Sequence, residues 1–236
     1  MVRRQRSVRP ERRTTVPVIR KSELDDDALT ADGLALSADA QGRVLLIACG
    51  ALAREIIDIR DQGGWDHIDL TCLPAIYHNH PERIAEAVEV TVAKHRTTHG
   101  RICVVYADCG TGGLLEETCV RLGVEMVAGP HCYSFFEGNE AFAERDEISA
   151  FYLTDFLARQ FDAFIWTPLG LDRHPELRDT YFGHYEKLVY LSQVDDPALA
   201  QRARGYADRL GLAFEHRRTG YGDLQTTIAG WAKRPS

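Results

Sequence analysis

The chain has 236 residues, enough for one α/β domain or two small ones. Hydrophobic residues make up 44% and charged residues 27%, as in ordinary globular proteins, which excludes collagen-like, coiled-coil and low-complexity classes. The longest nearly apolar stretch, residues 44–53, is far shorter than the roughly 20 residues of a membrane span. We therefore expect no interaction with a membrane.

Charge is distributed unevenly along the chain. Residues 1–22 contain seven arginines and one lysine against one glutamate, so their net charge is +7 and the remainder carries −14. Nucleic-acid binding depends on clustered Lys and Arg, so the acidic remainder argues against a nucleic-acid partner. We expect residues 1–40 to form a basic, disordered arm and residues 41–236 a single α/β domain. Because no apolar secretory segment follows the arm, we expect a cytoplasmic location.

Apolar runs alternate with helical patterns, which is typical of an α/β fold with parallel strands. The predicted strands are residues 44–49, 68–73, 104–109, 125–132, 164–169, 188–192 and 212–216. The predicted helices are residues 51–61, 81–96, 113–122, 139–161, 175–181, 197–210 and a C-terminal helix that ends near 233.

The strand-turn-helix-strand pattern recurs at a spacing of 60 residues, over 44–73, 104–133 and 164–193. A glycine follows the first strand of each copy, and Cys49, Cys109 and Leu169 take equivalent positions. The spacing predicts three pseudo-repeated units with parallel sheets in Rossmann-like layers, near residues 44–98, 102–162 and 163–216. An ordinary doubly wound sheet is the alternative.

Six cysteines occur, at positions 49, 72, 103, 109, 119 and 132. Open α/β sheets bind ligands at the carboxyl ends of their strands, where we expect Cys49, Cys109 and Cys132 to lie. Thiolates are good zinc ligands, so we predict that these three cysteines bind a metal. The alternative is packing in the core, to which we assign Cys103 and Cys119.

Histidines accompany these cysteines. His131 precedes Cys132, and because adjacent residues of an extended segment point in opposite directions, we expect Cys132 to face the site. We assign His131 to a supporting or acid/base role. His78 and His80 could bind metal too, but a surface loop is the expected place for them.

Further candidates lie in glycine-rich turns and on one predicted helix. Gly110, Thr111, Gly112 and Gly113 resemble a phosphate cradle without the dinucleotide-binding pattern, so we expect them to hold an anion or carboxylate. Tyr221 and Asp223 lie between glycines, a composition that serves a tight turn or a close approach of a ligand. The predicted ligand-binding residues are Gly110, Thr111, Gly112, Gly113 and Tyr221. The predicted catalytic residues are His131, Tyr152, Asp155 and Asp223.

Five motifs resemble those of a bacterial and archaeal family of unknown function. They are Ala48-Cys-Gly-Ala-Leu, Asp108-Cys-Gly-Thr-Gly-Gly, Gly129-Pro-His-Cys-Tyr, Phe151-Tyr-Leu-Thr-Asp-Phe and Gly220-Tyr-Gly-Asp-Leu. The resemblance covers residues 43–231 and implies a link to corrinoid-dependent methyltransferases and one-carbon metabolism. The predicted architecture also resembles quinolinate synthase, whose three repeats each supply one cysteine to an iron–sulfur cluster. Here Leu169 stands at the third position.

These observations lead to three functional hypotheses. The first is an enzyme whose Cys49, Cys109 and Cys132 bind zinc for methyl transfer to a small-molecule substrate, with a methylcorrinoid partner protein as donor. The second is an iron–sulfur enzyme with a quinolinate-synthase-like architecture. The third is a noncatalytic accessory protein that binds or delivers a corrinoid or a metal.

Overall fold

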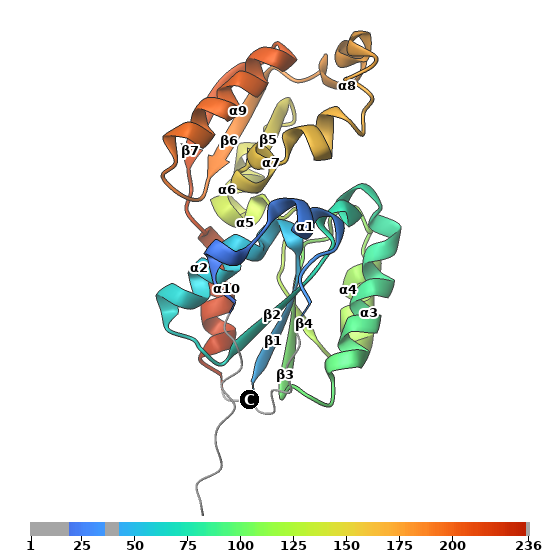
Figure 1. Ribbon diagram of the computed structural model, residues 1–236, viewed down its shortest axis with the longest axis vertical. Helices are drawn as coiled ribbons and strands as arrows, with labels where there is room; N and C mark the ends of the chain where they lie inside the picture. Colours follow the sequence, from blue (N-terminus) through green and yellow to red (C-terminus); the bar gives the residue numbers. More distant parts are fainter. Residues whose placement is uncertain (1–18, 36–42, 235–236) are drawn as a thin grey trace, which may run out of the picture.

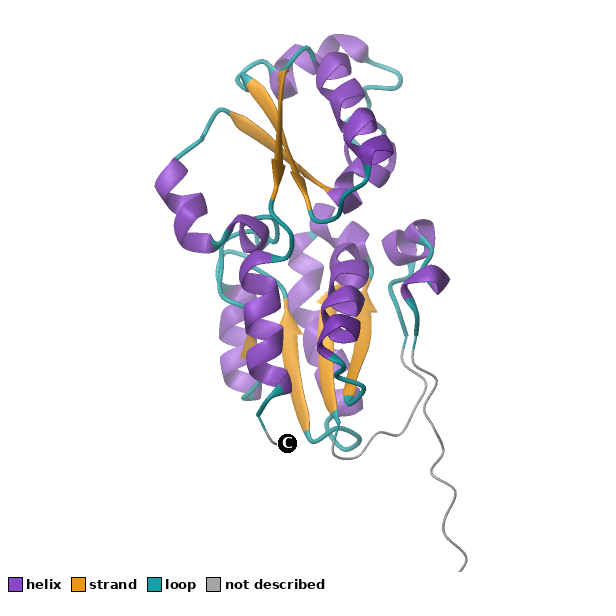
Figure 2. Cartoon of the chain, turned by 90° about the vertical axis from the view of Figure 1, so that its left-hand side faces the viewer, coloured by secondary structure: helices purple, strands orange, loops and turns teal. Residues whose placement is uncertain are grey.

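The computed structural model describes residues 19–35 and 43–234. Its strands form two parallel sheets, which lie one beyond the other along the longest axis of the molecule (Figure 1, Figure 2). We call the four-stranded sheet with its helices the first lobe, and the three-stranded sheet with its helices the second lobe. The prediction of an α/β fold with parallel sheets in Rossmann-like layers is confirmed.

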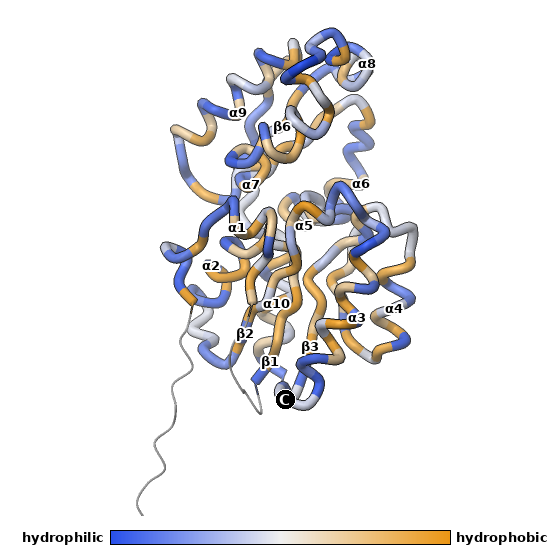
Figure 3. Tube along the Cα trace, turned by 45° about the vertical axis from the view of Figure 1, so that its right-hand side comes forward, coloured by the Kyte–Doolittle hydropathy of each residue, from blue (hydrophilic) through white to orange (hydrophobic). Residues whose placement is uncertain are grey.

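The first lobe contains the sheet with strand order β2-β1-β3-β4. Its strands are β1 (Val44–Cys49), β2 (Ile68–Leu73), β3 (Arg101–Val105) and β4 (Glu125–Met126). Every residue of β1 and β2 is buried, as expected for parallel strands covered on both faces. Figure 3 shows the resulting hydrophobic strands inside the lobe.

Helices cover both faces of this sheet, with α3 and α4 on one face and α2 and α10 on the other (Figure 1). They are α2 (Ala53–Gly63), α3 (Ile84–His95), α4 (Leu114–Leu122) and α10 (Gly222–Ala232). Short 3-10 helices follow two strands and precede α3, namely η2 (Gly50–Leu52), η3 (Ala75–Asn79) and η4 (Pro81–Arg83). Helix α10 thus returns the end of the described chain to the first lobe.

The second lobe contains the sheet β5-β6-β7, formed by β5 (Ala150–Thr154), β6 (Lys187–Ser192) and β7 (Ala213–Arg218). Its helices are α7 (Asp155–Arg159), η5 (Asp162–Trp166), η6 (Pro175–Leu177), α8 (Arg178–Phe182) and α9 (Pro197–Leu210). Leu188 and Tyr190 share an apolar cluster with α9, whereas Val189 and Leu191 share another with Phe142. The alternation follows from the period of two in a strand.

Two short helices connect the lobes, α5 (Ser134–Glu137) and α6 (Asn139–Arg145). The N-terminal segment adds η1 (Lys21–Glu23) and α1 (Asp26–Ala31), and Leu34 pairs with Cys72 at the edge of the first sheet. Residues 19–35 are therefore ordered, which corrects the predicted disorder for this part of the arm. The rest of that prediction falls on residues 1–18 and 36–40, which lie outside the described residues.

The predicted third copy of the repeat lacks its first strand, although its helix and second strand are present as η6, α8 and β6. Residues 164–169 are not a strand, because η5 is a π-helix that includes Phe164, and the backbone N–H of Thr167 donates to the carbonyl oxygen of Asp162. The predicted helix at 139–161 instead contains β5, and the predicted strand at 125–132 ends at Met126. Leu169 is consequently not equivalent to Cys49. Among the described residues, no helix is long and apolar enough to cross a membrane.

Helix α10 contributes fully buried side chains to the core of the first lobe. Ile228 is 0% exposed there, whereas Gln225 of the same helix is exposed. We expect Ile228→Ala to lower the free energy of unfolding by about 2–5 kcal/mol, because it leaves a cavity in a packed core. Gln225→Ala should change it by less than about 0.5 kcal/mol. Urea unfolding followed by circular dichroism measures both, and equal effects would contradict this placement of α10.

Candidate functional site

A cavity of about 280 Å³ lies between the carboxyl ends of the first sheet and strand β5 of the second lobe. The chain leaves β1 toward β2 on one side and continues from β3 to β4 on the other, so the strand order reverses between β1 and β3. At such a switch point the loops diverge and leave a crevice in which open α/β sheets bind ligands. Cys49 ends β1 and Cys109 follows β3, so the cavity opens at this crevice.

All three cysteines predicted as metal ligands line this cavity. Cys49 ends β1, whereas Cys109 and Cys132 lie in the turns after β3 and β4. The sulfur atoms of Cys109 and Cys132 are 3.1 Å apart. Cys103 lies fully buried within β3, and Cys119 lies in α4 with its thiol donating to the Met126 sulfur. Neither lines the cavity, in agreement with their assignment to the core.

The three thiols differ in their electrostatic surroundings. The contact with Cys132 and the neighbouring His78 lower the pKa of Cys109. The same contact, together with burial, raises the pKa of Cys132, so one proton remains on the pair. Burial raises the pKa of Cys49 to about 12. The geometry therefore favours a thiolate on Cys109 and thiols on its two neighbours at neutral pH.

The loop of Cys109 has an unusual backbone. Cys109 has a positive φ of 48°, which is uncommon for a residue with a side chain, and Gly110 follows with a φ of 82°. The Asp108 carboxylate stabilises this turn, because it accepts hydrogen bonds from the Thr111 hydroxyl and from the backbone N–H groups of Gly112 and Gly113. The predicted anion cradle of Gly110–Gly113 is thus already occupied by Asp108, which corrects that assignment.

His131 and Cys132 both line the cavity, contrary to the expectation that only one of them would. The reason is that residues 131–133 form a turn rather than an extended strand, with the N–H of Ser134 donating to the His131 carbonyl. Burial lowers the pKa of His131, so its imidazole is neutral at neutral pH. His78 also lines the cavity, although sequence reasoning assigned it to a surface loop.

The other predicted site residues lie in different surroundings. Tyr152 lines the cavity, and its hydroxyl donates to Glu147. Asp155 is 1% exposed and accepts hydrogen bonds from Tyr190 and from the backbone of Gln193 and Val194 within the second lobe. It does not line the cavity, and its hydrogen bonds connect the start of α7 to β6 and to the residues that follow β6.

Asp223 and Tyr221 likewise do not line the cavity. Asp223 accepts a hydrogen bond from the backbone N–H of Asn139, at the beginning of α6. The Tyr221 hydroxyl donates to Asp58 of α2. Asp223 thus connects α10 to the segment between the lobes, whereas Tyr221 connects the start of α10 to α2.

The second lobe supplies an aromatic wall to the cavity. The ring-bearing residues on this side are Phe151, Tyr152, Phe156, Phe164 and Tyr185. Tyr133 stacks on both His131 and Tyr152, with ring centroids 4.9 and 5.2 Å apart. None of the described residues that line the cavity is Asp, Glu, Lys or Arg. The thiols therefore face an apolar, largely uncharged space.

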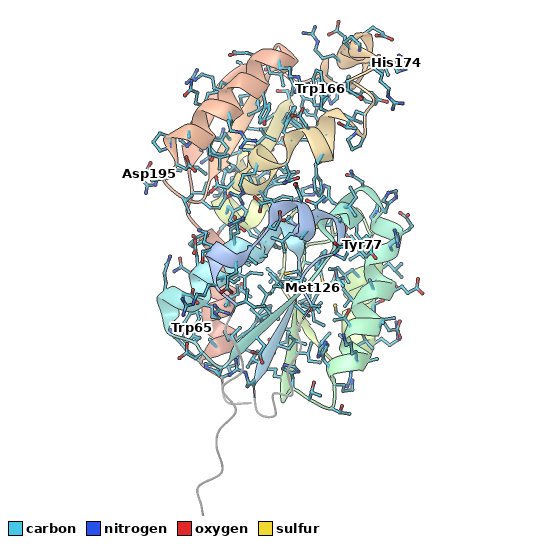
Figure 4. The ribbon with its side chains drawn as sticks, in the orientation of Figure 1. Trp65, Tyr77, Met126, Trp166, His174 and Asp195 are labelled. Atoms are coloured by element: carbon cyan, nitrogen blue, oxygen red, sulfur yellow. The ribbon has the colours of Figure 1, made fainter. Side chains whose placement is uncertain are left out.

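The lobes contact each other beside this cavity. The side-chain amide of Asn79 donates to the Phe164 carbonyl, from η3 in the first lobe to η5 in the second. Figure 4 labels Tyr77 of η3 and Trp166 of η5, which mark these two elements in the first and second lobe. A π-helix is rare and often occurs at functional sites, so η5 is consistent with a role for this wall.

Two buried polar groups near the cysteines have no hydrogen-bond partner. The Tyr106 hydroxyl lies among the cysteine thiols in a side chain that is 1% exposed. The Oε2 atom of Glu55 on α2 is likewise unpaired, and this carboxyl interacts electrostatically with Cys49. Sequence reasoning did not identify either residue. An unpaired buried polar group is costly unless a ligand, ion or water satisfies it.

The described residues contain no group of three His, Cys, Asp or Glu side chains in a preformed metal-binding arrangement. Two sulfurs bound to one tetrahedral zinc ion lie about 3.8 Å apart. Cys109 and Cys132 would have to separate by about 0.7 Å to bind it together.

Fold and site together define an α/β protein with a cysteine-lined cavity at the switch point of a parallel sheet. Residues 72–228 match the model of a family described as "Protein of unknown function (DUF1638)". The match spans more than half of the chain, so the chain belongs to this family. No curated protein and no solved structure matches it.

Glu55 makes the stability of the fold dependent on pH. Burial raises its pKa from 4.5 to about 7, so between these values the folded chain keeps a proton that the unfolded chain loses. Stability therefore falls as the pH rises through this window. Glu55→Gln carries no charge, and we expect it to be more stable than the wild type at pH 8 by on the order of 1–3 kcal/mol.

At pH 4 this variant and the wild type should be nearly equally stable, because Glu55 is then mostly protonated in both states. Urea unfolding at the two pH values measures the difference. The exposed Glu86→Gln on α3 serves as the control and should show no such change with pH. A stability difference for Glu55→Gln that is independent of pH would contradict the raised pKa.

Proposed function

We propose that the chain is a metal-dependent enzyme of one-carbon metabolism, in which Cys49, Cys109 and Cys132 hold a zinc ion that takes part in methyl transfer. The observation that carries the proposal is the convergence of these cysteines, from the end of β1 and from two separate turns, on one cavity at the switch point. Core cysteines would have no reason to gather where α/β sheets bind ligands. Cys103 and Cys119, which we assign to the core, do not line this cavity.

The donors around the cavity suit a soft metal. Sulfur and imidazole ligands favour zinc over magnesium or calcium, which prefer oxygen, and no carboxylate of the described residues lines the cavity. His78 lowers the pKa of Cys109 and lines the same cavity, so it is our candidate for a fourth ligand. Binding would release the protons of Cys49 and Cys132, so affinity should rise with pH.

The size of the cavity limits the substrate. Its volume of about 280 Å³ lies just below the range of typical ligand pockets, which is about 300–1,000 Å³. A small molecule fits this space, whereas a corrinoid macrocycle would remain outside it. This argues for a corrinoid on a partner protein, as the family resemblance implies, and against the alternative of an accessory protein that encloses a corrinoid.

In this proposal the chain's residues prepare a small thiol substrate for methylation. A bound zinc ion supplies a positive charge that lowers the pKa of the thiol. One ring nitrogen of the neutral His131 accepts the thiol proton. The substrate sulfur then forms a bond to the methyl carbon of a methylcorrinoid, and the corrinoid keeps the electron pair of the broken bond. The apolar aromatic wall excludes water from the nucleophile.

An iron–sulfur enzyme is the second candidate. Three cysteines without an accompanying carboxylate on the cavity wall also suit a cluster that leaves one iron open to substrate. The quinolinate-synthase-like version of this hypothesis loses its architectural basis, because Leu169 does not occupy the position equivalent to Cys49. A cluster would give the purified protein a visible absorption that zinc does not.

Metal analysis after anaerobic purification tests the proposal. We expect about one zinc per chain in the wild type and almost none in Cys109→Ser, because a serine oxygen replaces a soft thiolate poorly. Cys119→Ser should retain the metal, since this thiol lies in α4 away from the cavity. Either substitution costs roughly 1–3 kcal/mol if the new hydroxyl is buried without a partner.

Unfolding curves recorded in parallel separate loss of metal from loss of structure. Cobalt substitution adds a second readout, because its sulfur-to-metal absorption grows with the number of thiolate ligands. Equal metal content in Cys109→Ser and Cys119→Ser would contradict the assignment of Cys109 as a metal ligand and would favour the alternative, packing in the core. Iron with a visible spectrum in place of zinc would select the second candidate.

A further inference from the structure

Cys109 and Cys132 are placed to react with each other. Their sulfur atoms are 3.1 Å apart, and a disulfide bond of about 2.05 Å requires them to approach by about 1 Å. Both are free in the structure, and both line the cavity, through which a small molecule can reach them. Cys103 and Cys119 lie away from it within β3 and α4.

The backbone around the pair favours this approach. Cys109 lies in the turn that Asp108 stabilises, and Cys132 lies in a second turn after Gly129 and Pro130. Because neither cysteine belongs to a strand or a helix, a rotation of the two side chains disturbs no ladder of backbone hydrogen bonds. Cys49 differs, since it ends the fully buried strand β1.

The geometry points to a redox-active dithiol, in which a low-molecular-weight disulfide oxidises Cys109 and Cys132 to an intramolecular disulfide. The thiolate of Cys109 attacks one sulfur of the small disulfide, whose S–S bond breaks and releases one small thiolate. Cys132 loses its proton to solvent and attacks the Cys109 sulfur of the mixed disulfide, releasing the second thiolate. One released thiolate takes up the proton that Cys132 lost and the other takes a proton from solvent, so the cysteines are oxidised by two electrons and the small disulfide is reduced.

Oxidation would also control the proposed metal site. A disulfide removes two of the three thiolates, so bound zinc and the oxidised pair exclude each other. This consequence rests on the proposed function, whereas the sulfur chemistry does not, because it needs only the two cysteines and the oxidant. The cavity would then pass between a metal-binding and a metal-free form according to the thiol–disulfide balance around it.

The test uses the full chain, reduced, desalted without air and kept in EDTA so that no metal protects the thiols. After incubation with oxidised glutathione, free thiols are alkylated in acid and the peptides analysed without reduction. We expect two of the six thiols to disappear, with Cys109 and Cys132 in one cross-linked peptide whose mass is lower by two hydrogen atoms. Cys103 and Cys119 should remain alkylated.

Two variants make the result specific. Cys132→Ser should stop at the mixed disulfide and retain one glutathione on Cys109, whereas the control Cys119→Ser should form the cross-link as the wild type does. Six free thiols in the wild type, a stable glutathione adduct on Cys109, or a cross-link that includes Cys49 would overturn the inference. Because the readout is peptide mass in EDTA, a failure here leaves the metal analysis of the proposed function unaffected, and the reverse also holds.

Discussion

The opposite directions in which the chain leaves β1 and β3 determine where the candidate site lies. Parallel strands need crossover connections of fixed hand, so α2 covers one face of the first sheet while α3 and α4 cover the other. The turns after β1 and β3 therefore separate, and Cys49 and Cys109 border the space between them. No local motif encodes this proximity, because it arises from strand order alone.

The second lobe turns this open crevice into a cavity, and its position depends on polar contacts with the N-terminal segment. The Asp26 carboxylate at the start of α1 binds Arg54 of the first lobe at 2.8 Å and Arg159 of the second at 2.9 Å. Gln160 adds a hydrogen bond to Asp27. Asp26 is only 14% exposed, so these charge-assisted bonds are stronger than ordinary surface pairs. The segment expected to be disordered thus orders the two halves of the site.

Sequence patterns predicted some elements accurately and failed where one pattern suits two structures. The helix at 197–210 has every local signal, with Asp196 as a side-chain cap, a proline in its first turn and Gly211 at its end. The apolar run that begins at Phe164 fits a buried strand as well as a helix, and only packing against both lobes makes it the π-helix η5. The apparent 60-residue period reinforced this error in the first strand of the third unit, whereas the helix predicted at 175–181 and the strand predicted at 188–192 are observed.

Local signals in the sequence likewise located some residues of the candidate site and missed others. Cys49 and Cys109 stand directly before glycines near strand ends. That local signal indicated the carboxyl ends of the strands, where both cysteines line the cavity. His78 follows β2 at the same edge, so the argument used for the cysteines would have placed it at the cavity as well.

The glycine-rich loop shows the limit of such reasoning. A sequence reveals how many amides a turn offers, but the acceptor that occupies them is a matter of three-dimensional geometry, and here Asp108 satisfies them from within the same turn. That internal bond holds Cys109 in its left-handed conformation, so the loop contributes to the site through the position of a sulfur atom rather than through its own donors.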